Sequence, residues 1–204
     1  MSRAEATITK VADLVRGGGS YAKYEDMYRR DLTEIPSFRL LASRVQGKVV
    51  DLGCGIGYLS RLFPDYVGLD ETPSPLRTAR DHGVPRLVRG ALTTLPFTDS
   101  AFDWAVVYDV AEHLHDLDRA VLEVRRVARR AAFAVVDFTS YYRYFAHDET
   151  HVGHLAPREL IAVLERHYPY VESIPTSGIF RAPRFLNRVL AKRFPNEVVC
   201  FCGP

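Results

Sequence analysis

The chain has 204 residues, of which 47% are hydrophobic and 25% charged, an ordinary composition for a globular protein. This length fits a single domain, in which we expect residues 1–45 to form an N-terminal helical cap and residues 46–204 the core. The formal net charge of +2 is too small to indicate nucleic acid or a membrane surface as the main partner.

The cysteines and the N-terminal sequence bear on the cellular compartment. Three cysteines, Cys54, Cys200 and Cys202, are few and odd in number, which is typical of a reducing compartment. The N-terminus lacks the apolar segment of a secretory signal. No run reaches the roughly 18 apolar residues that a membrane span requires. We therefore expect a cytoplasmic protein.

The elements follow from hydrophobic spacing, taken in chain order. Residues 4–16 and 20–31 have helical spacing and are separated by three consecutive glycines, which break a helix. From residue 48 onward, short apolar runs alternate with helical patterns, which predicts βα units around a parallel sheet. The expected strands are 48–52, 66–69, 86–89, 102–108, 132–138, 170–174 and 197–201. The expected helices between them are 58–63, 74–82, 117–127, 157–167 and 183–193.

The segment 49–57, V-V-D-L-G-C-G-I-G, carries the most chemical information. An apolar strand contains Asp51 near its end and leads into three alternating glycines, Gly53, Gly55 and Gly57. Glycine permits positive φ and a close approach of the backbone to a ligand. Such a turn after a parallel strand is where open α/β sheets bind ligands. A dinucleotide loop would need its third glycine at Tyr58, so the spacing disfavours a nicotinamide-dependent reductase.

This segment resembles motif I of the class I S-adenosylmethionine-dependent methyltransferases. Residues 67–70, V-G-L-D, are similar to the family's second strand with its terminal acid. Residues 95–103 and 112–114 are similar to its fourth motif and to the residues that follow it. The resemblance covers about residues 45–165 and is closest to the small type 11 methyltransferases of quinone and natural-product pathways. It implies a Rossmann-like α/β fold: a mostly parallel seven-stranded sheet with an antiparallel last strand and helices on both faces.

The resemblance also implies S-adenosylmethionine as the cofactor and S-adenosylhomocysteine as its product. It assigns Asp51 to the ammonium end of the cofactor and the backbone of Gly53 and Gly55 to the methionine and ribose. Asp70 would accept hydrogen bonds from the ribose hydroxyls, as the equivalent acid does in dinucleotide folds. Glu71 is expected to line the adenine.

Further cofactor contacts are expected along the same edge of the sheet. Ala91 and Leu92 would flank the adenine, because the turn after the third strand does so in the family. The remaining candidates in this part of the chain are Cys54, Gly57 and Tyr108. Many relatives carry an acid at the position of Gly90, where it bonds the adenine amino group, so we expect weaker cofactor binding here.

Two tyrosines near the N-terminus complete the cofactor candidates. Tyr24 and Tyr28 lie on one face at helical spacing, and in relatives an N-terminal tyrosine often closes over the cofactor and bonds its carboxylate. The alternative is that both tyrosines only pack against neighbours. The basic residues of 181–193 predict a solvated helix face or, alternatively, a surface for an anionic substrate, a carrier protein or a membrane.

Candidates for acceptor chemistry follow the fourth and fifth strands. His113 would lie near the methyl group; the alternative is that it starts a helix and is satisfied by the backbone. Residues 146–154 hold three histidines and two acids and resemble a segment beside the substrate pocket of relatives. We predict that His151 acts there as a general base. A hydrogen-bonded loop cluster and a metal site are the alternatives, and no metal is predicted.

We predict methyl transfer to a hydroxyl or amine of a small-molecule metabolite, by a monomer or homodimer. Nucleic-acid amino methyltransferases carry prolines after the fourth strand, where residues 108–111 read Y-D-V-A. Protein arginine methyltransferases need paired glutamates there, and Glu112 stands alone. A cofactor-binding regulator and a cyclase on the same fold stay open as alternatives, because a fold does not determine a function.

Overall fold

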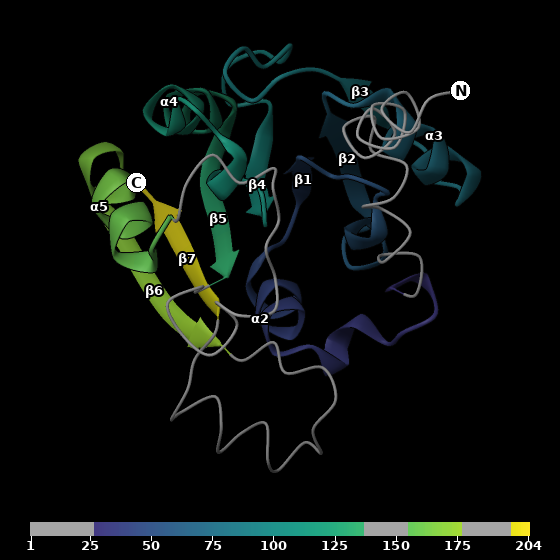
Figure 1. Cartoon of the computed structure of the whole chain (residues 1–204), viewed down its shortest axis with the longest axis horizontal. Helices are drawn as coiled ribbons and strands as arrows, with labels where there is room; N and C mark the ends of the chain where they lie inside the picture. The colour runs from purple at the N-terminus through teal and green to yellow at the C-terminus, as the bar shows by residue number, and fades with distance from the viewer. Residues whose placement is uncertain (1–26, 137–154, 177–196) are drawn as a thin grey trace, which may run out of the picture.

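A computed structural model of the chain describes residues 27–136, 155–176 and 197–204. Its centre is a seven-stranded sheet in the order β3-β2-β1-β4-β5-β7-β6 (Figure 1). The strands are β1 Lys48–Leu52, β2 Asp65–Asp70, β3 Leu87–Arg89, β4 Phe102–Tyr108, β5 Ala128–Val136, β6 Tyr170–Thr176 and β7 Glu197–Gly203. The helices are α2 Pro36–Arg44, α3 Pro73–Asp81, α4 Leu117–Val127 and α5 Pro157–His167, with short 3₁₀ turns η2 Leu32–Glu34, η3 Tyr58–Arg61 and η4 Ala111–His113.

The pairing of the strands confirms the predicted fold class. β1 pairs in parallel with β2 and β4, β2 with β3, and β4 with β5. β7 runs antiparallel to both of its neighbours, β5 and β6. Because the chain leaves β1 first toward β3 and later toward β5, the strand order reverses between β1 and β4. Open α/β sheets bind ligands outside the carboxyl ends of the strands at such a point.

Two hydrophobic clusters attach helices to the two faces of the sheet. Val50 belongs to one cluster with Val121 of α4 and Leu160 of α5. Val49 belongs to the other with Phe38 of α2 and with residues of α3. Adjacent residues of a strand point to opposite faces, so the apolar run of β1 supplies both layers. Helices therefore cover both faces, as predicted, and the strand ends at the reversal point are held between two packed layers.

The bounds of several elements differ from the sequence prediction for local reasons. The segment after the glycines is the short 3₁₀ turn η3 rather than a helix over 58–63, because the chain enters β2 at Asp65. β5 begins at Ala128, earlier than residue 132, since α4 leads directly into the strand and the charged Arg129 and Arg130 masked its start. α2 was not predicted at all. Residues 27–31 form a 3₁₀ turn and a bend, so the helix predicted over 20–31 does not continue to residue 31.

Two other expected helices, 4–16 and 183–193, lie outside the described residues. None of the helices in residues 27–136, 155–176 and 197–204 has the length and apolar character needed to cross a bilayer.

Candidate cofactor site

The glycine loop connects β1 to η3 at the point where the strand order reverses. Gly53, Gly55 and Gly57 all have positive φ, at 81°, 54° and 77°, a region that residues with a side chain adopt at a cost. The N–H of Gly53 and that of Cys54 both donate to the carbonyl of Leu69 in β2, at 2.7 and 2.9 Å. A Cβ atom at Gly53 would overlap Val110 Cγ2. Both conformation and space therefore require glycine here.

Asp70, the last residue of β2, faces this loop. Its Oδ2 accepts the N–H of Gly55 at 2.9 Å and its Oδ1 accepts the N–H of Thr72 at 2.8 Å. Burial raises the pKa of Asp70, whereas these hydrogen bonds to Thr72 and Gly55 lower it. Each oxygen of an ionised carboxylate can accept a second hydrogen bond. The carboxylate is thus fixed in orientation and retains acceptor sites for a ligand such as a ribose diol.

Asp51 lies within β1, beside this loop, and is buried with 2% of its surface exposed. Its Oδ2 accepts the hydroxyl of Tyr66 at 2.7 Å. Burial raises the pKa of Asp51 to about 7, the hydrogen bond from Tyr66 lowers it, and the charge of Asp70 raises it. A buried carboxylate held by a neutral hydroxyl is stabilised when a cation approaches. Asp51 is therefore chemically suited to the ammonium group that the sequence analysis assigned to it.

Tyr28 lies next to the glycine loop. Its hydroxyl donates to the carbonyl of Ile56 within the loop, and its ring stacks on His82 with the ring centroids 3.7 Å apart. The bond that we predicted from Tyr28 to the cofactor carboxylate stays a prediction. Tyr24, the other tyrosine of this pair, lies outside the described residues.

Arg61 fastens the segment before α2 to the same part of the molecule. Its guanidinium donates to the backbone carbonyls of Met27, Tyr28 and Arg30, at 2.9, 3.1 and 2.9 Å. Three hydrogen bonds from one cation hold the backbone of the 3₁₀ turn and bend at residues 27–30. The N-terminal segment is thereby placed against the glycine loop.

Tyr108, the last residue of β4, takes part in a buried polar network. Its hydroxyl lies 2.9 Å from Ser37 Oγ of α2 and donates to Glu197 at the start of β7. Glu197 also accepts the hydroxyl of Thr176 at 2.7 Å. Burial raises the pKa of Glu197, and the hydrogen bonds from Tyr108 and the other hydroxyls lower it. The predicted contact of Tyr108 with the cofactor stays a prediction.

Sequence reasoning missed the partners of Tyr108. Ser37 and Thr176 carry no local signal, because single hydroxyl residues occur throughout the chain. Glu197 did offer one signal, as an acid that opens the otherwise apolar strand 197–203.

The adenine candidates lie where β2 and β3 end side by side. The N–H of Gly90 donates to the carbonyl of Asp70 at 3.1 Å, and Arg89 Nε donates to the carbonyl of Glu71 at 3.1 Å. Ala91 and Leu92 follow directly in the chain. A Cβ atom at Gly90 would lie 3.2 Å from Leu69 Cδ1 and 3.3 Å from Pro96 Cδ. A side chain at this position would therefore require its neighbours to shift slightly.

The loop before β4 is anchored by a half-buried arginine of α4. Arg126 donates to both carboxylate oxygens of Glu123, at 2.9 and 2.8 Å, and to the carbonyls of Leu95 and Phe97 at 3.0 and 2.7 Å. Glu123 in turn accepts the N–H of Leu95 at 2.8 Å. The hydrogen bond from Arg126 holds the pKa of Glu123 well below its ordinary range, at about 2. This ion pair fixes the loop that resembles the fourth motif.

The candidates for acceptor chemistry are described in part. His113 lies in η4, just after β4, and its N–H donates to the carbonyl of Val110 at 3.0 Å. His151 and the whole run 146–154 lie outside the described residues. Within residues 27–136, 155–176 and 197–204, no group of three or more His, Cys, Asp or Glu side chains could hold a metal ion.

Comparison with known proteins identifies a family to which part of the chain is similar. Residues 50–136 match the family described as "Methyltransferase domain". The chain is therefore similar to methyltransferases over this part of its length. The matched residues run from β1 to β5 and include Asp51, the glycine loop and Asp70.

Individual relatives agree with this family. An uncharacterized methyltransferase of Mycobacterium sp. (strain KMS) is 33% identical over 111 residues, which cover 52% of this chain and 44% of that protein. The chain spans about half the length of the curated relatives it matches.

Solved structures share the fold of this chain. A Thermotoga maritima structure, described as an S-adenosylmethionine-dependent methyltransferase and possible histamine N-methyltransferase, has a TM-score of 0.72 and 19% identity, covering 92% of this chain and 96% of that one. The cyclase SpnF has a TM-score of 0.60 and 17% identity, covering 82% of this chain and 80% of that one. At these identities the likeness concerns the fold alone.

Proposed function

We propose that the chain transfers the methyl group of S-adenosylmethionine to a hydroxyl or amine of a small-molecule metabolite. The observation that carries this proposal is the arrangement of Asp70 against the glycine loop. Both carboxylate oxygens are oriented by backbone N–H groups of Gly55 and Thr72, at the ligand-binding edge of the sheet. The family match over residues 50–136 supports the same conclusion.

The residues of the site fit the chemical groups of this cofactor. A ribose diol matches the remaining acceptor capacity of Asp70. A cationic amino-acid end suits the buried carboxylate of Asp51, which has a hydroxyl partner in Tyr66. Glu71, Ala91 and Leu92 surround the turn at which β2 and β3 end, where an adenine would lie. When bound, the cofactor supplies an electrophilic methyl group on a sulfonium.

The acceptor side would consist of the cap and the segments after β4 and β5. We assign residues 1–45 to the cap and 46–204 to the core of one domain. The bonds from Arg61 to residues 27–30 and the contact of Ser37 with Tyr108 support a cap that packs beside the cofactor loop. His151 or His113 would accept a proton from the acceptor where the chemistry requires it. Bringing the acceptor into line and excluding water would supply most of the acceleration.

Calorimetric titration of S-adenosylmethionine and S-adenosylhomocysteine tests the cofactor assignment. We expect micromolar to submillimolar dissociation constants for the wild type. Asp70→Ala should weaken binding by about tenfold or more, because it removes charge-assisted hydrogen bonds. Asp65→Ala is the matched control: this acid opens the same strand, is exposed and pairs with Arg86. No wild-type binding at millimolar cofactor would refute the proposal.

A screen of small hydroxyl and amine compounds with methyl-labelled cofactor separates transfer from the alternatives. Transfer of the label to any compound rejects both a cofactor-binding regulator and a cyclase. Cofactor binding without transfer across the screen would favour them, and the likeness in fold to a cyclase gives that outcome a precedent.

A further inference from the structure

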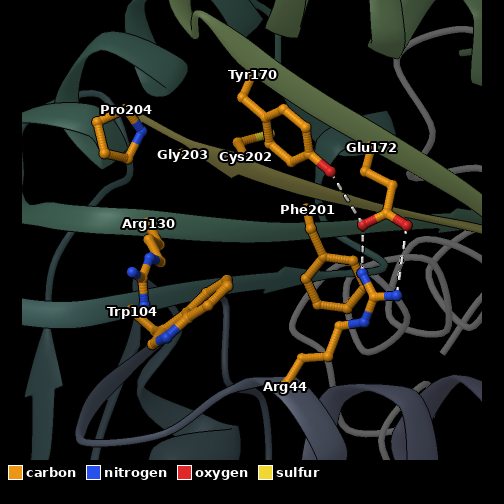
Figure 2. A pocket seen from close by; sticks show the side chains of 9 residues that line it. All are labelled: Arg44, Trp104, Arg130, Tyr170, Glu172, Phe201, Cys202, Gly203 and Pro204. Atoms are coloured by element: carbon orange, nitrogen blue, oxygen red, sulfur yellow. Dashed lines mark hydrogen bonds and ion pairs between the residues drawn. The ribbon is translucent and has the colours of Figure 1, made fainter.

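A pocket of about 380 Å³ lies among side chains of α2, β4, β5, β6 and β7, and Figure 2 shows the residues that line it. We call it the amino-end pocket. The pocket is lined by Arg44, Trp104, Arg130, Tyr170, Glu172, Phe201, Cys202, Gly203 and Pro204. Its volume is within the range of small-molecule sites, which are typically apolar clefts with a few polar groups.

The register of the sheet places this pocket near the amino ends of the parallel strands, whereas the cofactor site lies at their carboxyl ends. Trp104 and Arg130 are paired with each other in the first halves of β4 and β5. Tyr170 is the first residue of β6 and pairs with Gly203 at the end of the antiparallel β7. Parallel strands carry Asp70 and the glycine loop at their carboxyl ends, so a ligand in the amino-end pocket would be neither the cofactor nor the methyl acceptor.

One of the two arginines in the pocket is already neutralised. Arg44 pairs with both carboxylate oxygens of Glu172, and its Nη2 lies 3.3 Å from Oε1. The hydroxyl of Tyr170 donates to the same carboxylate at 3.4 Å. The Arg44 guanidinium also lies over the ring of Phe201, 4.8 Å from its centroid. These contacts balance the charge of Arg44 within the wall of the pocket.

The second arginine keeps its charge available. Arg130 is exposed, and its guanidinium lies over Trp104 at 5.7 Å from the ring centroid. Within the part of the chain that the structure describes, no carboxylate pairs with Arg130. Because Glu172 offsets Arg44, the ionisable side chains that line the pocket carry one excess positive charge. Arg130 is therefore the side chain with which a bound anion would form its most favourable ion pair.

The pocket also offers aromatic surface. Trp104 and Phe201 line the pocket with their rings nearly perpendicular and the centroids 6.1 Å apart, but both side chains are buried and the guanidinium groups of Arg130 and Arg44 lie over their rings. Tyr170 forms a wall, and 54% of its surface is exposed. An exposed aromatic ring beside a partly apolar pocket can stack with a planar ligand, since aromatic pairs prefer offset or edge-to-face contact.

We propose that the amino-end pocket binds a small aromatic anion, with its ring against Tyr170 and its carboxylate or sulfonate paired with Arg130, which lies over Trp104. Guanidinium and carboxylate groups match in geometry and can form two parallel hydrogen bonds. The excess positive charge favours an anion over a neutral or cationic ring. This binding site goes beyond the proposed methyl transfer and does not depend on it.

The single tryptophan of the chain makes this proposal directly testable. Trp104 is the one tryptophan in the sequence, so a ¹H–¹⁵N correlation spectrum contains a single indole signal that needs no assignment. The full chain is titrated at constant ionic strength with benzoate and, separately, with benzyl alcohol, a neutral analogue of similar shape. We expect benzoate to shift the indole signal saturably with a Kd of about 1 mM, as its small size allows. Benzyl alcohol should bind at least about tenfold more weakly.

Two variants that carry the same charge change locate the binding. Arg130→Gln should weaken benzoate binding about tenfold. Arg129→Gln should leave it within about twofold, since its side chain points to the opposite face of β5. Far-UV circular dichroism of both variants verifies the fold. The shift should persist in saturating S-adenosylhomocysteine.

Four results would overturn the proposal. These are an indole signal that does not move at benzoate concentrations up to about 20 mM, an equal response to benzyl alcohol, an equal loss in Arg129→Gln, and displacement of benzoate by S-adenosylhomocysteine.

Discussion

Asp51 should make the free energy of unfolding depend on pH near neutrality, and Asp51→Asn isolates this effect. The folded protein holds the pKa of Asp51 at about 7, above the ordinary value of about 3.9 for an unfolded chain. Folding therefore favours the protonated acid. Its contribution to stability is fully present below about pH 4 and is lost as the pH rises through 7. Asparagine retains an oxygen acceptor for the Tyr66 hydroxyl and has no charge to bury.

The two pKa values determine the size of the effect. One pKa unit corresponds to about 1.4 kcal/mol, so the wild type should lose about 2.5 kcal/mol of unfolding free energy through this group between pH 5 and pH 8. Asp51→Asn should lack this loss, and its stability relative to the wild type should rise by that amount over the same range. The same variant should bind the cofactor more weakly, because the negative charge that favours an ammonium group is gone.

Urea unfolding followed by circular dichroism at pH 5, 6, 7 and 8 measures this difference. Titrating groups that do not interact with Asp51 contribute equally to both proteins and cancel in the comparison. Asp65→Asn removes the same charge from the exposed start of the neighbouring strand and serves as the matched control. A pH-independent difference between Asp51→Asn and the wild type would refute the inference that burial raises the pKa of this carboxyl group.

Three further predictions use matched pairs or linkage. Gly53→Ala and Gly83→Ala both place a side chain at φ near +81°, which costs about 1 kcal/mol. Among the described residues, a Cβ at Gly83 meets nothing within 4 Å, whereas one at Gly53 overlaps a valine, so urea unfolding should show Gly53→Ala to be about 1–3 kcal/mol less stable than Gly83→Ala. Arg126→Met should cost about 2–3 kcal/mol because it leaves a carboxylate and several carbonyls without their donor, whereas the exposed Arg125→Met should cost under about 0.5 kcal/mol. Cofactor binding at pH 7 should release protons, measured by calorimetry in buffers of different ionisation enthalpy, because a cation near Asp51 favours its ionised form; the absence of release would contradict the role of that acid.

Local sequence patterns predicted the parts of the fold that depend on local signals. The bounds of β1, β4 and α4 follow directly from apolar runs and helical spacing. The glycine loop and Asp70 were predictable because a ligand turn needs glycine and acid at fixed spacing along one βα unit.

Features that join distant parts of the chain were not predictable in this way. The hydroxyl of Tyr108 contacts Ser37 and Glu197, which lie 71 and 89 residues away in sequence, and no local pattern records that proximity. The amino-end pocket has the same origin, since the strand register brings Arg130 beside Trp104. α2 was missed because its buried side chains, Phe38 and Leu41 among them, are interspersed with polar residues.

The position of β7 has a consequence for the newly made chain. β7 lies between β5 and β6 and is hydrogen-bonded to both, although the ribosome makes it after either of them. Until residues 197–203 emerge, β5 presents an unpaired edge composed largely of alanine, valine and phenylalanine, and such an edge invites pairing with other chains. β6 cannot cover it, because β6 joins the sheet through β7. The edge of β5 is therefore protected against pairing with other chains only after β7 has been synthesised.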